Sequence, residues 1–124
     1  MLTMLIIDDS SYMRTIVSVY VSKLDIKIVG EAGNGREGLE KYKELSPDIV
    51  VLDLAMDEMD GIQTLTEIMA INPEAVVIIA SSIAGQERVI VEALKLGAKI
   101  VFDKPIDKKK FTEYITNLIN EKKS

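Results

Sequence analysis

Acidic residues, serines and a lysine stand where four apolar stretches of this chain end. In chain order these residues are Asp8 and Asp9, then Asp53, then Ser81 and Ser82, then Asp103 and Lys104. If the four stretches are strands of an open parallel sheet, their carboxyl ends meet at one edge, which is where ligands collect. Carboxylates, a hydroxyl and a lysine at such an edge can hold a divalent cation and accept a phosphoryl group.

The acids predict a metal site. Asp8, Asp9 and Asp53 would repel one another at one edge, and burying unpaired charge is costly. Mg²⁺ removes this difficulty, because it prefers a few carboxylates together with waters and a phosphate. The simpler alternative is that Asp8 and Asp9 cap the helix that begins near Ser10. One aspartate suffices for a cap, so the pair together with Asp53 favours the metal.

Asp53 and Lys104 complete the chemistry. Asp53 ends a fully apolar run, and a carboxylate can attack phosphorus to give an aspartyl phosphate. Phosphoryl transfer needs mainly positioning and charge neutralisation, which Mg²⁺ and the Lys104 ammonium would supply. A hydroxyl after the third stretch would bind a phosphoryl oxygen, and the residues alone leave Ser81 and Ser82 equally eligible. Asp103 is excluded, because strand alternation turns it away from Lys104.

Composition narrows the class of protein. The chain has 124 residues and a net charge of −5, which argues against general binding to nucleic acid or anionic membranes. It has no cysteine and no histidine, so thiolate and imidazole catalysis are excluded and any phosphohistidine belongs to a partner. Neither a signal peptide nor an apolar stretch long enough to cross a membrane is present. We expect a cytoplasmic protein.

Strand and helix patterns alternate along the whole chain. The expected strands are Met4–Asp8, Ile26–Ala32, Asp48–Asp53, Ala75–Ser81 and Lys99–Asp103. A stretch with helical spacing of apolar residues follows each one, and Gly35, Gly61 and Gly97 mark helix boundaries. Five such pairs predict right-handed crossovers and a parallel sheet with helices on both faces, an α/β fold. We expect one domain over residues 1–124.

The motifs resemble bacterial response-regulator receiver domains. The motifs that carry the resemblance are Ile6–Asp9, Val51–Met56, Met59–Gly61 and Lys104–Pro105. They occur in the family's order, and the similarity extends over essentially the whole chain. The resemblance implies a flavodoxin-like (βα)5 three-layer sandwich with strand order 2-1-3-4-5. It also implies a phosphoacceptor in a two-component system, with a histidine kinase as donor. Segment 10–14 and the lack of an output domain resemble the single-domain chemotaxis type.

The resemblance assigns a role to each matching residue. Asp53 would be the phosphoacceptor, and Lys104 would contact the phosphoryl group. Asp9, Asp53 and the backbone carbonyl of Ala55 would bind Mg²⁺ directly, and Asp8 would hold it through water. Spacing to the lysine selects Ser82 over Ser81 as the switch hydroxyl.

Phosphorylation would then shift an equilibrium at the face formed by the fourth helix, fifth strand and fifth helix. A downstream protein would bind this face of a monomer or of a phosphorylation-dependent dimer.

Three positions depart from the family pattern. Asp57 stands where a proline is usual, Ile83 where a small residue is usual, and Val101 where an aromatic residue usually couples the switch hydroxyl to the output face. Phe102 should point to the opposite face of the sheet. These departures favour an alternative, a non-phosphorylated interaction module. A haloacid-dehalogenase-like phosphatase is the third hypothesis, but Asp8-Asp9 lacks the spacer of its Asp-x-Asp motif.

Overall fold

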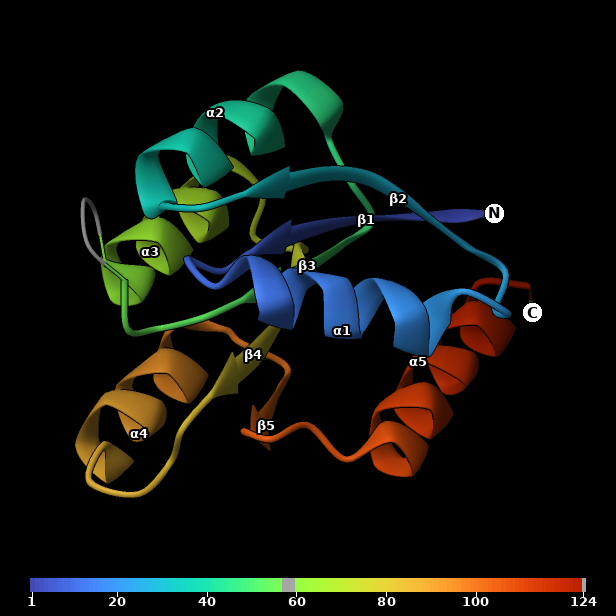
Figure 1. The fold of residues 1–124 in the computed structure, drawn as a ribbon. Helices are drawn as coiled ribbons and strands as arrows, with labels where there is room; N and C mark the ends of the chain where they lie inside the picture. Colours follow the sequence, from blue (N-terminus) through green and yellow to red (C-terminus); the bar gives the residue numbers. More distant parts are fainter. Residues whose placement is uncertain (57–59, 124) are drawn as a thin grey trace.

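Strands and helices alternate strictly along the chain. The computed structural model describes residues 1–56 and 60–123 (Figure 1). The elements are β1 (Leu2–Ile7), α1 (Ser11–Val21), β2 (Ile26–Ala32), α2 (Gly35–Leu45), β3 (Ile49–Leu52), α3 (Gly61–Ile71), β4 (Val76–Ser81), α4 (Glu87–Leu96), β5 (Ile100–Asp103) and α5 (Lys108–Lys123). All five expected strands are therefore confirmed, with ends that differ from the predictions by two residues or fewer at each boundary.

The five strands form one parallel sheet in the order β2-β1-β3-β4-β5. The register pairs Ile7 with both Ala32 and Leu52, and it pairs Ser81 with Asp103. The strands consequently end at nearly the same level. The residue that follows each strand therefore lies at a common edge, and the predicted flavodoxin-like fold is confirmed.

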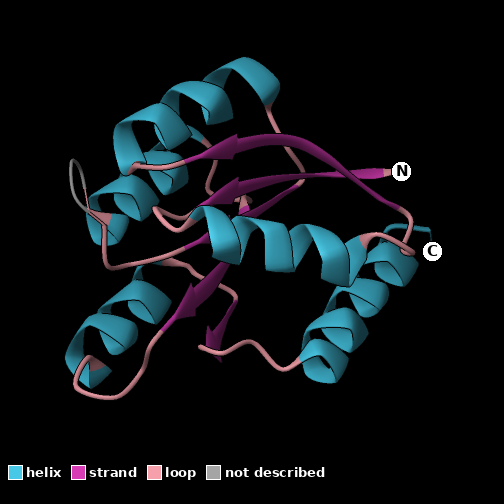
Figure 2. Cartoon of the chain, in the orientation of Figure 1, coloured by secondary structure: helices cyan, strands magenta, loops and turns pink. Residues whose placement is uncertain are grey.

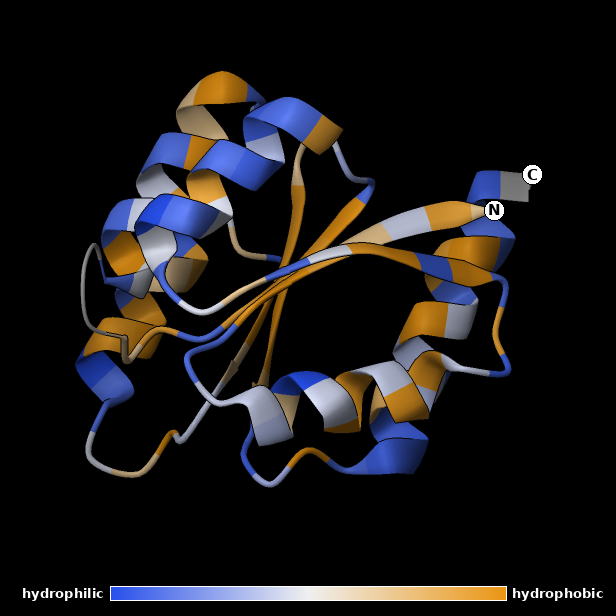
Figure 3. Cartoon of the chain, turned by 45° about the horizontal axis from the view of Figure 1, so that its top comes forward, coloured by the Kyte–Doolittle hydropathy of each residue, from blue (hydrophilic) through white to orange (hydrophobic). Residues whose placement is uncertain are grey.

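Helices cover both faces of the sheet, which gives three layers (Figures 1 and 2). On one face α2, α3 and α4 pack on the sheet through residues such as Leu39, Leu65 and Ile90. On the other face α1 and α5 pack through residues such as Val17 and Phe111. The central strands are apolar on both sides, as the largely hydrophobic colouring of the sheet in Figure 3 shows. A strand buried on both faces is the expected partner of two helical layers.

Three helices begin at the same edge of the sheet with a side-chain cap. Ser10, Asn34 and Asp60 accept hydrogen bonds from the backbone N–H groups of Met13, Glu37 and Gln63. Such caps satisfy N–H groups that the first helical turn leaves unpaired. They also fix the connections that follow β1, β2 and β3. Within the described residues, none of the helices combines the length and apolar character needed to cross a bilayer.

Candidate phosphoryl and metal site

Three carboxylates meet at the carboxyl edge of the sheet. Asp8 and Asp9 directly follow β1, and Asp53 directly follows β3. One carboxylate oxygen from each lies within 4.8 Å of the other two. Asp8 and Asp53 are only 5% and 4% exposed, whereas Asp9 is exposed. The capping alternative is not supported, because Ser10 caps α1 and the Asp8 side chain accepts the N–H of Ser10 instead.

Lys104 brings a positive charge to these acids. It follows β5, and its Nζ lies 2.8 Å from Oδ2 of Asp8 and 3.5 Å from Oδ2 of Asp53. Its backbone N–H donates to the carbonyl of Ser81, and its peptide bond to Pro105 is cis. The ammonium therefore stands between the two buried carboxylates. One cation beside three acids leaves the site with an excess of negative charge.

Burial dominates the electrostatics of Asp53. Loss of solvent raises the pKa of the Asp53 carboxyl, and the neighbouring Asp8 charge raises it further. Lys104 opposes this increase, as do two hydrogen bonds to Oδ1, one from the Ala55 N–H and one from the Ser81 hydroxyl, each 3.2 Å long. The pKa of Asp53 remains above its ordinary value. The Asp53 carboxylate is thus poorly solvated, and a bound cation would stabilise its charge.

The structure separates the two candidate serines. Ser81 is buried, and its hydroxyl touches Asp53, whereas Ser82 is exposed just after β4. The hydroxyl at the carboxylates in this structure is therefore that of Ser81. Asp103 lies apart from the acids, as alternation predicted, and its carboxylate accepts the N–H of Ile83 at 2.9 Å.

Gly61 supports the site, although its motif position gave no sign of this role. The N–H of Gly61 donates to the carbonyl of Leu54 at 3.1 Å. A Cβ atom here would lie 2.3 Å from the Leu54 Cα and 2.5 Å from the Asp53 carbonyl oxygen. Only glycine lets α3 begin so close to the segment that follows β3. The close approach of two backbones carries no sequence signal beyond the glycine itself.

Two of the three departures from the family pattern, Ile83 and Val101, line one groove. It has a volume of about 560 Å³, and its lining includes Ile83, Val101, Asp103 and Tyr114. Val101 packs with the α2–α3–α4 layer, whereas Phe102 packs with α5, so the predicted opposite orientation is confirmed. Phe102 makes edge contacts with Phe111 and Tyr114. Asp57, the third departure, lies outside the described residues.

Known proteins share both the sequence and the fold of this chain. The family model of the response regulator receiver domain matches residues 4–116. Chemotaxis protein CheY of Thermotoga maritima is 43% identical over 114 residues, which cover 92% of this chain and 94% of that protein. CheY of Listeria monocytogenes is 48% identical over 105 residues, which cover 85% of this chain and 87% of that protein.

Solved structures agree with the sequence matches. A chain from the crystal structure of the CheX–CheY–BeF3–Mg complex of Borrelia burgdorferi superposes with a TM-score of 0.87 at 32% identity. The match covers 95% of this chain and 89% of that one. The response regulator domain of Thermotoga maritima CheB superposes with a TM-score of 0.81 at 31% identity, covering 97% of this chain and 94% of that one.

This chain therefore belongs to the response regulator receiver domain family. It is related to CheY and is a signalling phosphoacceptor of the two-component type. The predicted family resemblance and the predicted class of function are both confirmed.

Proposed function

We propose that Asp53 accepts a phosphoryl group from a histidine kinase in a reaction that depends on Mg²⁺. The observation that carries the proposal is the meeting of Asp8, Asp9 and Asp53 oxygens within 4.8 Å, with the Lys104 ammonium beside two of them. A site with this excess of negative charge suits a further cation and an electrophile.

The donor set fits Mg²⁺. Carboxylate and carbonyl oxygens are hard ligands, and Mg²⁺ commonly binds one or two carboxylates together with water and phosphate. Asp9, Asp53 and the backbone carbonyl of Ala55 would hold the ion, and Asp8 would hold it through water. The exposed Asp9 leaves the site open to solvent and to a donor. Bound Mg²⁺ supplies neutralisation of the carboxylates and of the phosphoryl oxygens.

The step itself is a displacement at phosphorus. An oxygen of the Asp53 carboxylate forms the new P–O bond while the P–N bond of the donor phosphohistidine breaks. The leaving imidazole nitrogen keeps the electron pair and takes up a proton. The chain has no histidine, so the phosphohistidine is a partner's. Lys104 holds its charge where the incoming phosphoryl oxygens would lie. The protein would catalyse its own phosphorylation and slow dephosphorylation and would act as a signalling protein.

The phosphorylated state would be read by Ser82 and passed to a partner. Ser82 is exposed just after β4 and would turn its hydroxyl towards the phosphoryl group. Val101 stands where the family usually has an aromatic residue. In the active state the Val101 side chain would pack differently from that aromatic ring. The proposed output surface is the α4–β5–α5 face of a monomer or of a phosphorylation-dependent dimer. Residues 1–124 would act as one receiver domain in the cytoplasm, with chemotaxis as the pathway that the CheY relatives support.

Intact-protein mass spectrometry tests the proposal. Wild-type protein incubated with acetyl phosphate or phosphoramidate and Mg²⁺ should gain the mass of one phosphoryl group. Asp53→Asn should gain none, and EDTA should abolish the gain in the wild type. A wild type that stays unmodified at saturating Mg²⁺ would refute phosphoryl acceptance and support a non-phosphorylated interaction module.

A further inference from the structure

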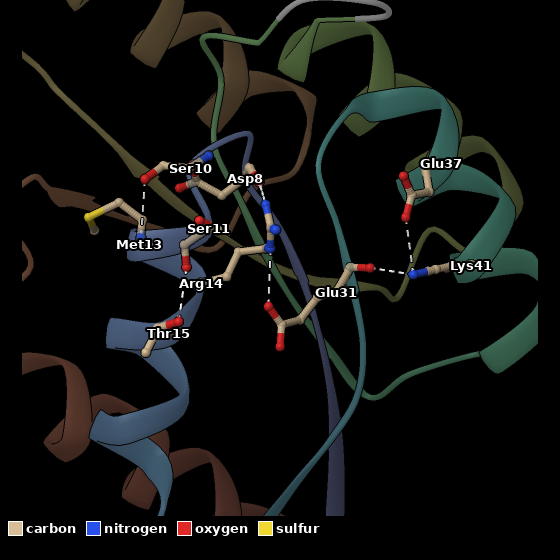
Figure 4. Close-up of polar contacts among 9 residues, drawn as sticks. All are labelled: Asp8, Ser10, Ser11, Met13, Arg14, Thr15, Glu31, Glu37 and Lys41. Carbon is tan, nitrogen blue, oxygen red and sulfur yellow. Dashed lines mark hydrogen bonds and ion pairs between the residues drawn. The ribbon is translucent and has the colours of Figure 1, made fainter.

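Arg14 connects the acidic site to the neighbouring strand. It lies on the first turns of α1 and is mostly buried, with 19% of its side chain exposed. Its Nη1 donates to the backbone carbonyl of Asp8, and its Nε lies 3.1 Å from a carboxylate oxygen of Glu31 at the end of β2. Figure 4 shows the guanidinium reaching both residues from α1.

The Arg14 contact completes the bonding of Asp8. The N–H of Asp8 donates to the carbonyl of Ala32 at 3.0 Å. One side-chain oxygen accepts the N–H of Ser10, and the other binds Lys104. The backbone carbonyl accepts from Arg14. Each polar group of Asp8 is therefore held, and the peptide that links it to the next residue cannot rotate without breaking the guanidinium contact.

That peptide matters because it leads to Asp9. Asp9 is exposed, and within the described residues its carboxylate has no ion-pair partner. The position of its carboxylate is therefore set by the backbone that carries it. Fixing the Asp8–Asp9 peptide fixes the direction in which Asp9 offers its oxygens to a metal.

Glu31 in turn holds the guanidinium. Glu31 pairs with Ile6 in the register of β1 and β2, so it lies level with the end of β1. Lys41 of α2 donates to the backbone carbonyl of Glu31 and forms an ion pair with Glu37 (Figure 4). The Arg14–Glu31 ion pair is partly exposed, with 46% of the Glu31 side chain accessible, so it contributes little to global stability. Its effect is to orient the planar guanidinium of Arg14 towards two acceptors, which a lysine ammonium cannot reproduce.

We propose that Arg14 is a positioning residue of the Mg²⁺ site. It acts through the Asp8–Asp9 peptide without touching the metal, and Glu31 orients it. This inference rests on the proposed function, because it requires that Asp9 binds Mg²⁺. Outer partners of metal ligands typically change metal affinity by about 10- to 100-fold when they are removed.

Mg²⁺ titration followed by amide NMR signals of Asp9 and Ala55 tests the inference. Arg14→Ala should raise the Kd for Mg²⁺ by about 10-fold or more. Arg14→Lys should give an intermediate Kd, because one ammonium cannot reproduce both contacts. Glu31→Gln should weaken binding less than Arg14→Ala does, since the amide oxygen can still accept from the guanidinium. The matched control is Arg36→Ala, which removes an exposed arginine at the start of α2 and should leave the Kd unchanged.

Thermal unfolding in EDTA separates positioning from stability. Arg14→Ala should lose Mg²⁺ affinity while its Tm stays close to that of Arg14→Lys. A lower Tm with an unchanged Kd would overturn the inference and leave Arg14 a purely structural residue. If Arg14→Ala does not fold, an Arg14→Lys Kd equal to that of the wild type overturns it. If the wild type itself shows no saturable Mg²⁺ response, the proposed function fails and the inference fails with it.

Discussion

The hydroxyl of Ser81 donates a hydrogen bond of 3.2 Å to the Asp53 carboxylate, across the neighbouring strands β4 and β3. The contact is buried and lies on the oxygen that also accepts the Ala55 N–H. Ser82, one residue later, is exposed. The two adjacent serines therefore differ in their environment. Ser81 stabilises the ionised Asp53 carboxylate, whereas Ser82, the proposed switch residue, is exposed to solvent.

Removing the Ser81 hydroxyl should raise the pKa of Asp53. This hydrogen bond favours the ionised carboxyl, so Ser81→Ala leaves the charge less well compensated. A 13C NMR titration of the Asp53 carboxyl without Mg²⁺ should show its midpoint moving to higher pH. Ser82→Ala is the matched control and should leave that midpoint in place. Equal midpoints in wild type and Ser81→Ala would contradict the hydrogen-bond assignment.

Asp53→Asn should stabilise the protein in the absence of Mg²⁺. Burial and Asp8 raise the pKa of Asp53 above its ordinary value of 3.8, so the folded state holds a proton there more tightly than the unfolded chain does. Ionised Asp53 therefore disfavours folding: the loss of stability develops as pH rises from 3.8 towards the raised pKa and is complete above it. At pH 7 we expect Asn to add about 1 kcal/mol or more to the free energy of unfolding, which corresponds to roughly 4 °C in Tm.

The pH dependence checks this explanation. The advantage of Asp53→Asn should shrink as pH falls below the pKa of Asp53, because the wild-type carboxyl is then protonated and neutral. Urea denaturation at several pH values in EDTA measures it. An advantage that is the same at low and neutral pH would show that charge is not its cause.

Lys104→Met should destabilise the protein and should do so more strongly without Mg²⁺. The ammonium compensates Asp8 and Asp53, and its side chain is 18% exposed. Breaking a fully buried pair costs about 3–5 kcal/mol, and we expect about 2 kcal/mol here because solvent reaches the site. Mg²⁺ should restore part of the loss by neutralising the same carboxylates. Lys99→Met, at an exposed lysine just before β5, is the control and should change little. An equal loss of stability with and without Mg²⁺ would refute the idea that Lys104 and Mg²⁺ neutralise the same carboxylates.

Gly61→Ala should cost about 3 kcal/mol of stability and block phosphorylation. Its Cβ would lie 2.3 Å from the Leu54 Cα, so the backbone beside Asp53 must move. Gly33→Ala is the control for the backbone clash, because the one atom near its Cβ would be Nη1 of Arg14 at 3.7 Å, an ordinary van der Waals distance that leaves the guanidinium in place. Circular dichroism melting and the phosphorylation mass shift measure both effects. Normal phosphorylation of a stable Gly61→Ala would show that α3 can retreat without disturbing the acceptor.

Much of this site could be predicted because strand ends are visible in sequence. Apolar runs that stop at Asp8, Asp53 and Lys104 indicate both the strands and their common edge, and the parallel register brings those residues together. The same reasoning excluded Asp103 from the acids.

The sequence pattern did not predict the contacts that backbone atoms make. The N–H of Ile83 on Asp103 and the Arg14 guanidinium on the Asp8 carbonyl depend on loop geometry that no spacing encodes. The choice between Ser81 and Ser82 depends on where one strand ends, and a one-residue difference reverses which serine is buried.

The segment that carries Ser82 also lines the groove beside β5. Ile83 contributes to that lining and is tied through its N–H to Asp103, which belongs to the groove as well. A molecule bound in the groove would therefore touch the residue next to the proposed switch hydroxyl. Coupling between two sites is reciprocal in free energy. If phosphorylation of Asp53 changes the affinity for a molecule in the groove, binding of that molecule must change the stability of the phosphorylated state by the same factor.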